Sequence, residues 1–244
     1  MCGRYVQARA GADLAADLGV HLAEGAEVRP SWNVAPTTNV PIVVERLDED
    51  ELRREIHVAR WGLLPGWAKD AKQSYKTFNA RSETVIEKPT FRAAVRSRRC
   101  AVPADAYYEW LTEGTQKRPH VIRPADGRLI TFAGLYEWWK DPSADQWVLS
   151  TSILTGPSPE PGPGGVLDDL AALHDRMPLP LGPKHFSEWL SAEKLDKDDA
   201  ALLLLQVRAE ALEVASGWEI YEVGREVGNV RHNSPELIAP LQRG

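Results

Sequence analysis

The chain contains 244 residues, and 29 lysines and arginines against 35 aspartates and glutamates give it a formal net charge of −6. Hydrophobic residues make up 43% of the chain and charged residues 26%, which excludes disordered and fibrous classes and is typical of a soluble globular protein. On net charge alone, nucleic acid is a disfavoured partner.

The signals for targeting and redox environment favour the cell interior. Only two cysteines occur, Cys2 and Cys100, and neither belongs to a CxxC pair, so a disulfide framework and a zinc ribbon are both poorly supported. No apolar run reaches the ~18–20 residues of a membrane span, and residues 1–22 lack the layout of a signal peptide. We therefore expect a cytoplasmic protein with no membrane partner.

The first elements in chain order are a helix and a hairpin. Leu14, Leu18 and Leu22 stand at helical spacing, which predicts a short helix within residues 11–22. Two prolines, at 30 and 36, then bracket a segment that we expect to be irregular. Residues 40–44 and 52–61 follow as strand patterns around an acidic turn, which predicts a β-hairpin.

Strand patterns continue through the middle of the chain, and helices follow. We expect a helical turn over 91–97 and one buried strand over 99–111, with Pro103 at an edge, bulge or bend. The remaining expected elements are strands over 120–123, 129–138 and 147–154, a loop over 155–165, helices over 166–173 and 186–207, and a strand followed by turns up to Ile238. This order predicts an α+β fold, and the lack of a repeat or long linker predicts a single domain over residues 1–240.

Charge is distributed unevenly along the chain. Residues 60–123 contain 13 lysines and arginines against 6 acidic residues, a balance of +7, so the remainder carries −13. Four aromatic residues, Trp61, Trp67, Tyr75 and Phe78, lie within the basic half. Interleaved cations and aromatic rings suit single-stranded nucleic acid, because phosphates bind lysine and arginine while bases stack on rings. The alternative is a solvated basic surface over a tryptophan-rich core.

The N-terminal sequence MCGRY carries the most distinctive chemistry. Removal of Met1 would leave Cys2 with both a free α-amine and a thiol. This removal is a peptidase-type reaction, because it hydrolyses the Met1–Cys2 peptide bond. The amine, with a pKa of about 7.7–8.0, is partly neutral at pH 7 and can attack an aldehyde, after which the thiolate closes a thiazolidine ring. Two other interpretations remain open: Cys2 is an ordinary small apolar residue, as Cys100 is, or it is the nucleophile of an N-terminal-nucleophile amidohydrolase.

Further motifs follow MCGRY in order along almost the whole chain. They are WNVAPT (32–37), RWGLLPGWAKD (60–70), FNARSET (78–84), RCAVPADAYYEW (99–110), LHDRMP (173–178) and VGNVRHNSPEL (227–237). Together with the first motif, this series closely resembles the SRAP family of abasic-site processing proteins. No glutamine-site motif of the amidotransferases that begin with Met-Cys-Gly is present downstream.

The resemblance implies a barrel-like, largely antiparallel β-core with flanking helices, and a positively charged groove for single-stranded DNA. It implies that Cys2 crosslinks to the ring-opened aldehyde of an abasic site, with lyase and crosslink-reversal activities also possible. No metal or organic cofactor is implied, and we expect a cytoplasmic monomer that associates with the nucleoid when bound to DNA. The family's catalytic positions correspond to Cys2, Asn79, Glu109 and His174, and its DNA-facing positions to Arg4, Trp67, Asn79 and Arg81.

Each of these roles has a physical basis and an alternative. Desolvation of Glu109 within AYYEW would raise its pKa and suit it to transfer protons, whereas a buried ion pair with an arginine such as Arg81 would be a structural role. His174 titrates near neutrality and could assist opening of the deoxyribose ring, although a lone histidine is more often structural. Trp67 could stack at the lesion or pack in the core.

Two further residues suit contacts with the sugar and the phosphate. Asn79 can donate and accept hydrogen bonds at the sugar, while Arg81 can hold a phosphate with its guanidinium fork or remain a surface charge. The chain departs from the family at TGPSPEPGPGG, where relatives usually carry a shorter stretch containing Thr and Asn, so the DNA contacts of residues 152–165 are left open. A non-catalytic single-stranded DNA-binding module is the remaining alternative function.

Overall fold

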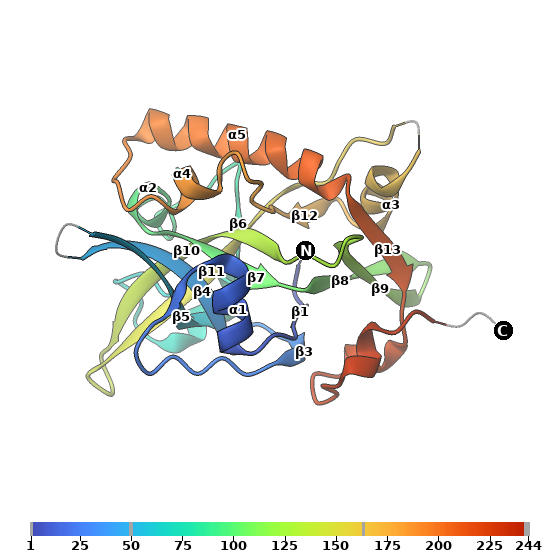
Figure 1. Cartoon of the computed structure of the whole chain (residues 1–244), viewed down its shortest axis with the longest axis horizontal. Helices are drawn as coiled ribbons and strands as arrows, with labels where there is room; N and C mark the ends of the chain where they lie inside the picture. Colours follow the sequence, from blue (N-terminus) through green and yellow to red (C-terminus); the bar gives the residue numbers. More distant parts are fainter. Residues whose placement is uncertain (1, 49–50, 163, 242–244) are drawn as a thin grey trace.

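Two β-sheets form the centre of the molecule in the computed structural model, which describes residues 2–48, 51–162 and 164–241 (Figure 1). The strands are β1 (Tyr5–Gln7), β2 (His21–Leu22), β3 (Ser31–Val34), β4 (Asn39–Asp48), β5 (Glu51–Trp61), β6 (Asn79–Arg81), β7 (Arg99–Ala104), β8 (Ala106–Glu113), β9 (Gln116–Pro124), β10 (Ile130–Asp141), β11 (Gln146–Pro157), β12 (Arg176–Pro178) and β13 (Trp218–Glu222). The helices are α1 (Gly11–Leu18), α2 (Ala94–Ser97), α3 (Val166–Leu173), α4 (Phe186–Leu190) and α5 (Lys197–Ala215), with 3-10 turns η1 (Ala71–Lys76), η2 (Arg225–Gly228) and η3 (Pro235–Ile238).

The larger sheet closes into a barrel. Its strand order is β12-β11-β10-β7-β4-β5-β2, and β5 also pairs in parallel with β11, so that β11, β10, β7, β4 and β5 form a closed ring. The predicted hairpin is confirmed as β4 and β5, which pair from Asn39↔Arg60 to Asp48↔Glu51. Most pairings are antiparallel, and short β6 adds to β11 in parallel. The predicted α+β class with a barrel-like, largely antiparallel core is confirmed.

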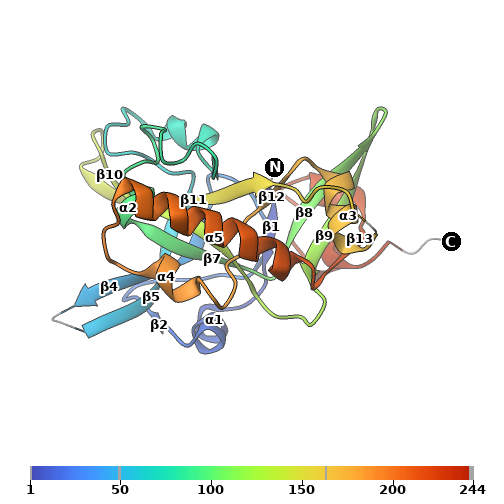
Figure 2. The same cartoon turned by 90° about the horizontal axis from the view of Figure 1, so that it is seen from above.

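The helices cover the outside of this barrel. A hydrophobic cluster joins outward-facing barrel residues such as Ala101 and Leu135 to Leu14 of α1, Trp189 of α4 and Val207 of α5. Figure 2 shows α5 running across the barrel strands with α4 beside it. No helix in the described ranges is long and apolar enough to cross a membrane.

The smaller sheet, in the order β13-β9-β8-β1-β3, stands at one end of the barrel. Its inner face and the barrel interior share one core, which includes Tyr5, Tyr107, Trp218 and Trp61. The prediction of one strand over 99–111 is wrong, because the chain changes sheets at Asp105. The Asp105 carboxylate accepts a hydrogen bond from the Ala8 amide at 2.6 Å, which fixes this corner beside β1.

Pro103 lies within β7 and pairs with Thr131 of β10 on one side. On the other side, the pairing of β7 with β4 is at Val43↔Ala101 and does not include Pro103. Its missing N–H is therefore tolerated, as expected for a strand edge.

Three other expected boundaries are corrected. The first helix ends at Leu18, because Gly19 adopts the left-handed conformation (φ 63°) that caps it. Residues 31–34, expected to be irregular, form β3 through pairing with β1. Residues 155–157, expected to be loop, extend β11 and pair with β12, so a proline- and glycine-rich composition hides a strand end.

The expected helix over 186–207 is two helices. Asp196 accepts hydrogen bonds from the amides of Asp198 (2.8 Å) and Asp199 (2.9 Å), and so starts α5 as an N-cap. The guanidinium of buried Arg99 donates to the carbonyls of Trp189, Ser191 and Glu193 and stabilises the break between α4 and α5. In the sequence, the signal for the start of α5 is Asp196 itself, an N-cap residue type directly before the helix.

Candidate active site

Cys2 lies at the junction of the two sheets and is completely buried. The side-chain amide of Asn79 donates a hydrogen bond to the Cys2 carbonyl at 2.7 Å, and the Arg4 backbone amide lies beside the Cys2 sulfur. Burial, followed by the negative charge of Glu109, raises the pKa of the Cys2 thiol well above its ordinary value. The thiol is therefore neutral at pH 7 until a nearby base removes its proton.

Aromatic rings fix the position of Asn79 opposite Cys2. Tyr5 contacts Trp61 edge-on with ring centroids 5.1 Å apart, and Trp61 contacts Phe78 in the same way at 5.8 Å. The indole of Trp61 donates to the Phe78 carbonyl at 2.8 Å, directly before Asn79. The Asn79 side-chain oxygen is buried and accepts no hydrogen bond from the described residues, so an acceptor remains available at the site.

Glu109 of β8 is 6% exposed and lies beside Cys2. Burial raises the pKa of the Glu109 carboxyl, while the nearby His174 charge and the Trp110 amide, which donates to it at 3.3 Å, oppose this shift. The predicted desolvation is confirmed. The alternative of an ion pair with Arg81 is wrong, because Arg81 is exposed and makes no salt bridge to Glu109.

His174 follows α3 and belongs to the electrostatic surroundings of Glu109. Its Nδ1 accepts the Arg176 amide at 3.0 Å and lies 2.6 Å from the Asp175 carboxylate. The amide requires a lone pair on Nδ1, whereas the carboxylate favours a proton there.

Sequence reasoning missed the clamp that anchors this histidine segment. Arg176 donates to both Glu83 oxygens, at 2.7 and 2.9 Å, and to the Thr155 carbonyl at 2.9 Å. Glu83 belongs to FNARSET and Arg176 to LHDRMP, so the clamp joins two of the motifs and holds β12 beside β6 and β11. In the sequence, the only sign of this clamp is that the two motifs carry residues of opposite charge.

We predict that Glu83→Gln weakens the fold in a pH-dependent way. The hydrogen bonds from Arg176 lower the pKa of Glu83 to about 2, so the stabilisation exists above its ordinary pKa near 4.3 and disappears as pH falls toward 2. Because the carboxylate is 35% exposed, the loss at pH 7 should be no more than about 1 kcal/mol. Urea unfolding of both proteins between pH 7 and about pH 2.5 measures it.

Glu87→Gln is the matched control, since its exposed pair with Lys197 joins two surface residues. An equal loss in both variants, or a difference from wild type that persists at low pH, would contradict the clamp.

Arg4 lies in an internal network. Its Nη1 donates to the Asn33 side-chain oxygen and to the Val227 carbonyl, both at 2.7 Å, and its guanidinium lies 5.9 Å from the ring centre of Trp110. Asn33 belongs to WNVAPT and Val227 to VGNVRHNSPEL, so this network joins MCGRY to two other motifs. The predicted contact of Arg4 with DNA stays a prediction.

Arg81 and Trp67 are the accessible members of the predicted set. Arg81 ends β6 immediately after Asn79, and its guanidinium forms no hydrogen bond or ion pair with the described part of the chain. Trp67 is 59% exposed, so the core-packing alternative is wrong. Tyr75, in the same basic loop, is 63% exposed. The loop leaves β5 through Gly62 (φ 140°), where a Cβ atom would collide with the Ser74 carbonyl.

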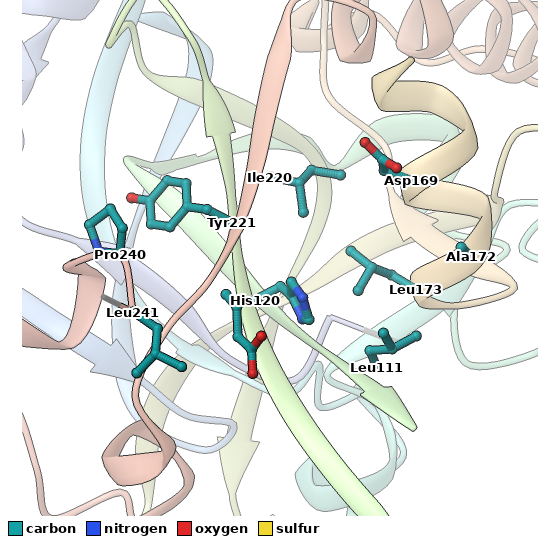
Figure 3. A pocket seen from close by; sticks show the side chains of 10 residues that line it. Leu111, His120, Asp169, Ala172, Leu173, Ile220, Tyr221, Pro240 and Leu241 are labelled. Atoms are coloured by element: carbon teal, nitrogen blue, oxygen red, sulfur yellow. The ribbon is translucent and has the colours of Figure 1, made fainter. Parts of the chain in front are cut away.

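A pocket of about 520 Å³ opens between α3 and strands β9 and β13 (Figure 3). Figure 3 shows Asp169 and Leu173 along α3, across from His120 and Ile220 of β9 and β13. None of Cys2, Asn79, Glu109 or His174 lines it, although His120 stands opposite Glu109 in the strand register. Among the described residues, no group of three or more His, Cys, Asp or Glu side chains is arranged to hold a metal ion.

Two motifs therefore meet at Cys2, FNARSET through Asn79 and AYYEW through Glu109, and LHDRMP lies near Glu109 through His174. Residues 1–230 match the family described as SOS response associated peptidase (SRAP). The chain is 37% identical over 241 residues to the abasic site processing protein YoqW of Bacillus subtilis (strain 168), covering 98% of this chain and 99% of that protein.

More distant relatives show the same similarity over most of this chain. The abasic site processing protein HMCES of Xenopus tropicalis is 29% identical, over 87% of this chain and 67% of that protein. A crystal structure of a protein from Bacteroides thetaiotaomicron, 24% identical, superposes with a TM-score of 0.78 over 99% of this chain and 100% of that one, which shows the same fold. By its family match and its relatives, the chain belongs to the SRAP family.

Proposed function

We propose that this protein captures abasic sites in single-stranded DNA as a covalent thiazolidine through Cys2. The observation that carries the proposal is that Asn79 and Glu109, with His174 near Glu109, lie beside a cysteine that becomes N-terminal once Met1 is removed. The names of the relatives support abasic site processing. The protein would act as a monomer in the cytoplasm, on single-stranded DNA.

The reaction balances without an oxidant or a reductant. The neutral α-amine of Cys2 adds to the aldehyde carbon of the ring-opened sugar and gives a carbinolamine. In its protonated form, which burial favours by raising its pKa, Glu109 donates a proton to the departing hydroxyl, and water leaves as the iminium forms. Glu109 then takes the thiol proton, sulfur bonds to the iminium carbon, and the ring nitrogen is left as a neutral secondary amine that keeps its one hydrogen. One aldehyde and one aminothiol give one thiazolidine and one water.

The other residues of the site have supporting roles. His174 is placed to move a proton as the sugar ring opens, and the free acceptor of Asn79 suits a hydroxyl of the open sugar. Reversal follows the same steps backwards through Glu109. The imine also permits β-elimination of the 3′ phosphate, so weak lyase activity accompanies capture when ring closure is slow.

The test is incubation of the Met1-free protein with single-stranded DNA that contains one abasic site, followed by denaturing electrophoresis after heating. A heat-stable adduct with this DNA and none with undamaged DNA is expected. Cleavage of amides without any DNA adduct would instead favour the amidohydrolase, and binding without any adduct would favour a non-catalytic binding module.

We predict that Trp67→Ala and Arg81→Ala weaken binding of undamaged single-stranded DNA in different ways. Loss of a stacking ring should lower affinity about tenfold without changing the salt dependence. Loss of one phosphate contact should reduce the slope of log affinity against log salt by about 0.7. Fluorescence anisotropy over a range of salt concentrations measures both effects.

Trp147→Ala is the matched control, because Trp147 is 63% exposed on β11 and belongs to none of the motifs. If all three variants bind like wild type, or if Trp147→Ala weakens binding as much as Trp67→Ala, the proposed DNA surface is wrong.

A further inference from the structure

Asn33 of β3 links the C-terminal segment to Arg4, directly before the first strand. It is 6% exposed, and its side-chain amide donates to the carbonyls of Val227 (3.3 Å), Asn229 (3.1 Å) and His232 (2.7 Å). Its side-chain oxygen accepts from Arg4 at 2.7 Å. A buried side chain with both polar ends occupied has a single orientation, because any rotation would leave a donor or acceptor unsatisfied.

Arg4 is held by its side chain and by its backbone. The guanidinium bonds to Asn33 and to the Val227 carbonyl and lies over Trp110, the neighbour of Glu109. The Tyr108 amide donates to the Arg4 carbonyl at 3.0 Å, which anchors Arg4 to the strand that carries Glu109. The Arg4 amide in turn lies beside the Cys2 sulfur, where it favours the thiolate. A continuous series of contacts thus leads from the C-terminal segment to the nucleophile.

We propose that Asn33 is a positioning residue for Cys2: acting through Arg4, it holds the N-terminal strand so that the sulfur and amine of Cys2 face Glu109 and Asn79. Asn33 itself touches no reacting atom in this arrangement. This inference rests on the proposed function, because that function supplies the natural substrate. The placement of Cys2 can nevertheless be measured with a small aldehyde in the absence of DNA.

Loss of the Asn33 oxygen leaves a half-buried guanidinium with one partner fewer, and Arg4 can then leave Trp110 for solvent. The Arg4 amide is then expected to move with it, which weakens the contact with the sulfur that favours the thiolate. The groups facing Cys2 are Glu109 and Tyr107 of β8 and Tyr5 of β1, and Asn33→Ala changes none of them. A change in the pH dependence of Cys2 chemistry in this variant therefore reports on the Arg4 contact.

Formaldehyde is a suitable probe, because it condenses with an N-terminal aminothiol to a thiazolidine that intact-mass spectrometry detects. With Met1-free Asn33→Ala, we expect the condensation rate to fall about tenfold and its midpoint to move to higher pH. Asn233→Ala is the matched control: the Asn233 oxygen accepts from the Trp32 amide at 2.7 Å in the same junction but does not contact Arg4. This control variant should have a less stable fold, but it should condense with formaldehyde at the wild-type rate.

Arg4→Ala provides a second, independent variant in case Asn33→Ala folds poorly. It should show the same slowing and the same pH shift, and the double variant should be no slower than either single one. Equal slowing in Asn33→Ala and Asn233→Ala, additive losses in the double variant, or an unchanged pH midpoint would overturn the proposal. A wild-type protein that reacts with formaldehyde but not with abasic DNA would contradict the proposed function and leave this inference standing.

Discussion

Glu109→Gln is expected to slow crosslinking to abasic DNA by about 10²- to 10⁴-fold, the usual contribution of a general acid–base group. Glutamine keeps the size of the side chain but can neither donate a proton to the departing hydroxyl nor accept the thiol proton. Affinity for undamaged single-stranded DNA should stay close to wild type, because Glu109 is buried in the sheet junction. Single-turnover crosslinking at saturating DNA, followed on denaturing gels, measures the rate.

The same substitution should stabilise the fold at neutral pH. Burial raises the pKa of Glu109 in the folded state, so ionisation of this group above its ordinary pKa near 4.3 favours unfolding. The penalty disappears as pH falls below that value, where the carboxyl is protonated in both states. The variant should therefore melt at a higher temperature than wild type at pH 7, and the two melting temperatures should converge in acid.

Glu210→Gln is the matched control for a buried carboxylate outside the site. Glu210 is 3% exposed and accepts from the Lys184 amide at 2.8 Å and from His185 at 2.7 Å, so its loss should destabilise the fold and leave crosslinking intact. A Glu109→Gln protein that crosslinks at the wild-type rate, or one that binds undamaged DNA much more weakly, would show that the acid–base assignment is wrong.

Cys2→Ala is expected to abolish the heat-stable adduct. Removal of Met1 still exposes an α-amine in this variant, so the imine still forms, but no sulfur is present to close the ring. Borohydride reduction should therefore trap a DNA adduct that heating otherwise destroys. Since the imine also permits β-elimination, strand cleavage per imine formed should rise relative to wild type. Gels with and without borohydride separate the two products.

Cys100→Ala is the control for this variant, because Cys100 is equally buried. Among the described residues, Thr151 is the hydrogen-bonding neighbour of the Cys100 sulfur, at 3.5 Å. The control should crosslink as wild type does. A Cys2→Ala protein that forms as much heat-stable adduct as wild type would contradict the thiazolidine.

The motifs predict the site better than the local patterns predict the elements. The motifs assign Asn79, Glu109 and His174 to one site; in the structure Asn79 and Glu109 lie beside Cys2, and His174 lies near Glu109. The single strand expected over 99–111 is wrong because hydrophobicity does not change where β7 passes into β8, and only the long-range contact of Asp105 with Ala8 marks the corner.

The sequence does not predict which residues of different motifs contact one another. Arg81 is a plausible ion-pair partner for Glu109 by sequence, yet Arg81 is exposed and Glu109 is buried without it. The arginines that bind internally between motifs include Arg4 and Arg176, whose side-chain partners lie 29 and 93 residues away. No local pattern encodes such distances, although each partner lies within one of the motifs.

Net charge is also a poor guide to the DNA-binding surface. The overall charge of −6 disfavours a nucleic-acid partner, but the basic and aromatic residues concentrate in residues 60–123, where Trp67 and Tyr75 are exposed. Charge averaged over the chain bears on solubility, whereas binding depends on one face.

Peptide mapping of the crosslink tests covalent capture by Cys2 most directly. The Met1-free protein is reacted with single-stranded DNA containing one abasic site, digested with nuclease and protease, and analysed by tandem mass spectrometry. We predict a sugar remnant on the peptide that begins at Cys2, attached through both the α-amine and the sulfur and accompanied by the loss of one water. An adduct on any other residue, or an unmodified N-terminal peptide from protein that has bound the DNA, would contradict it.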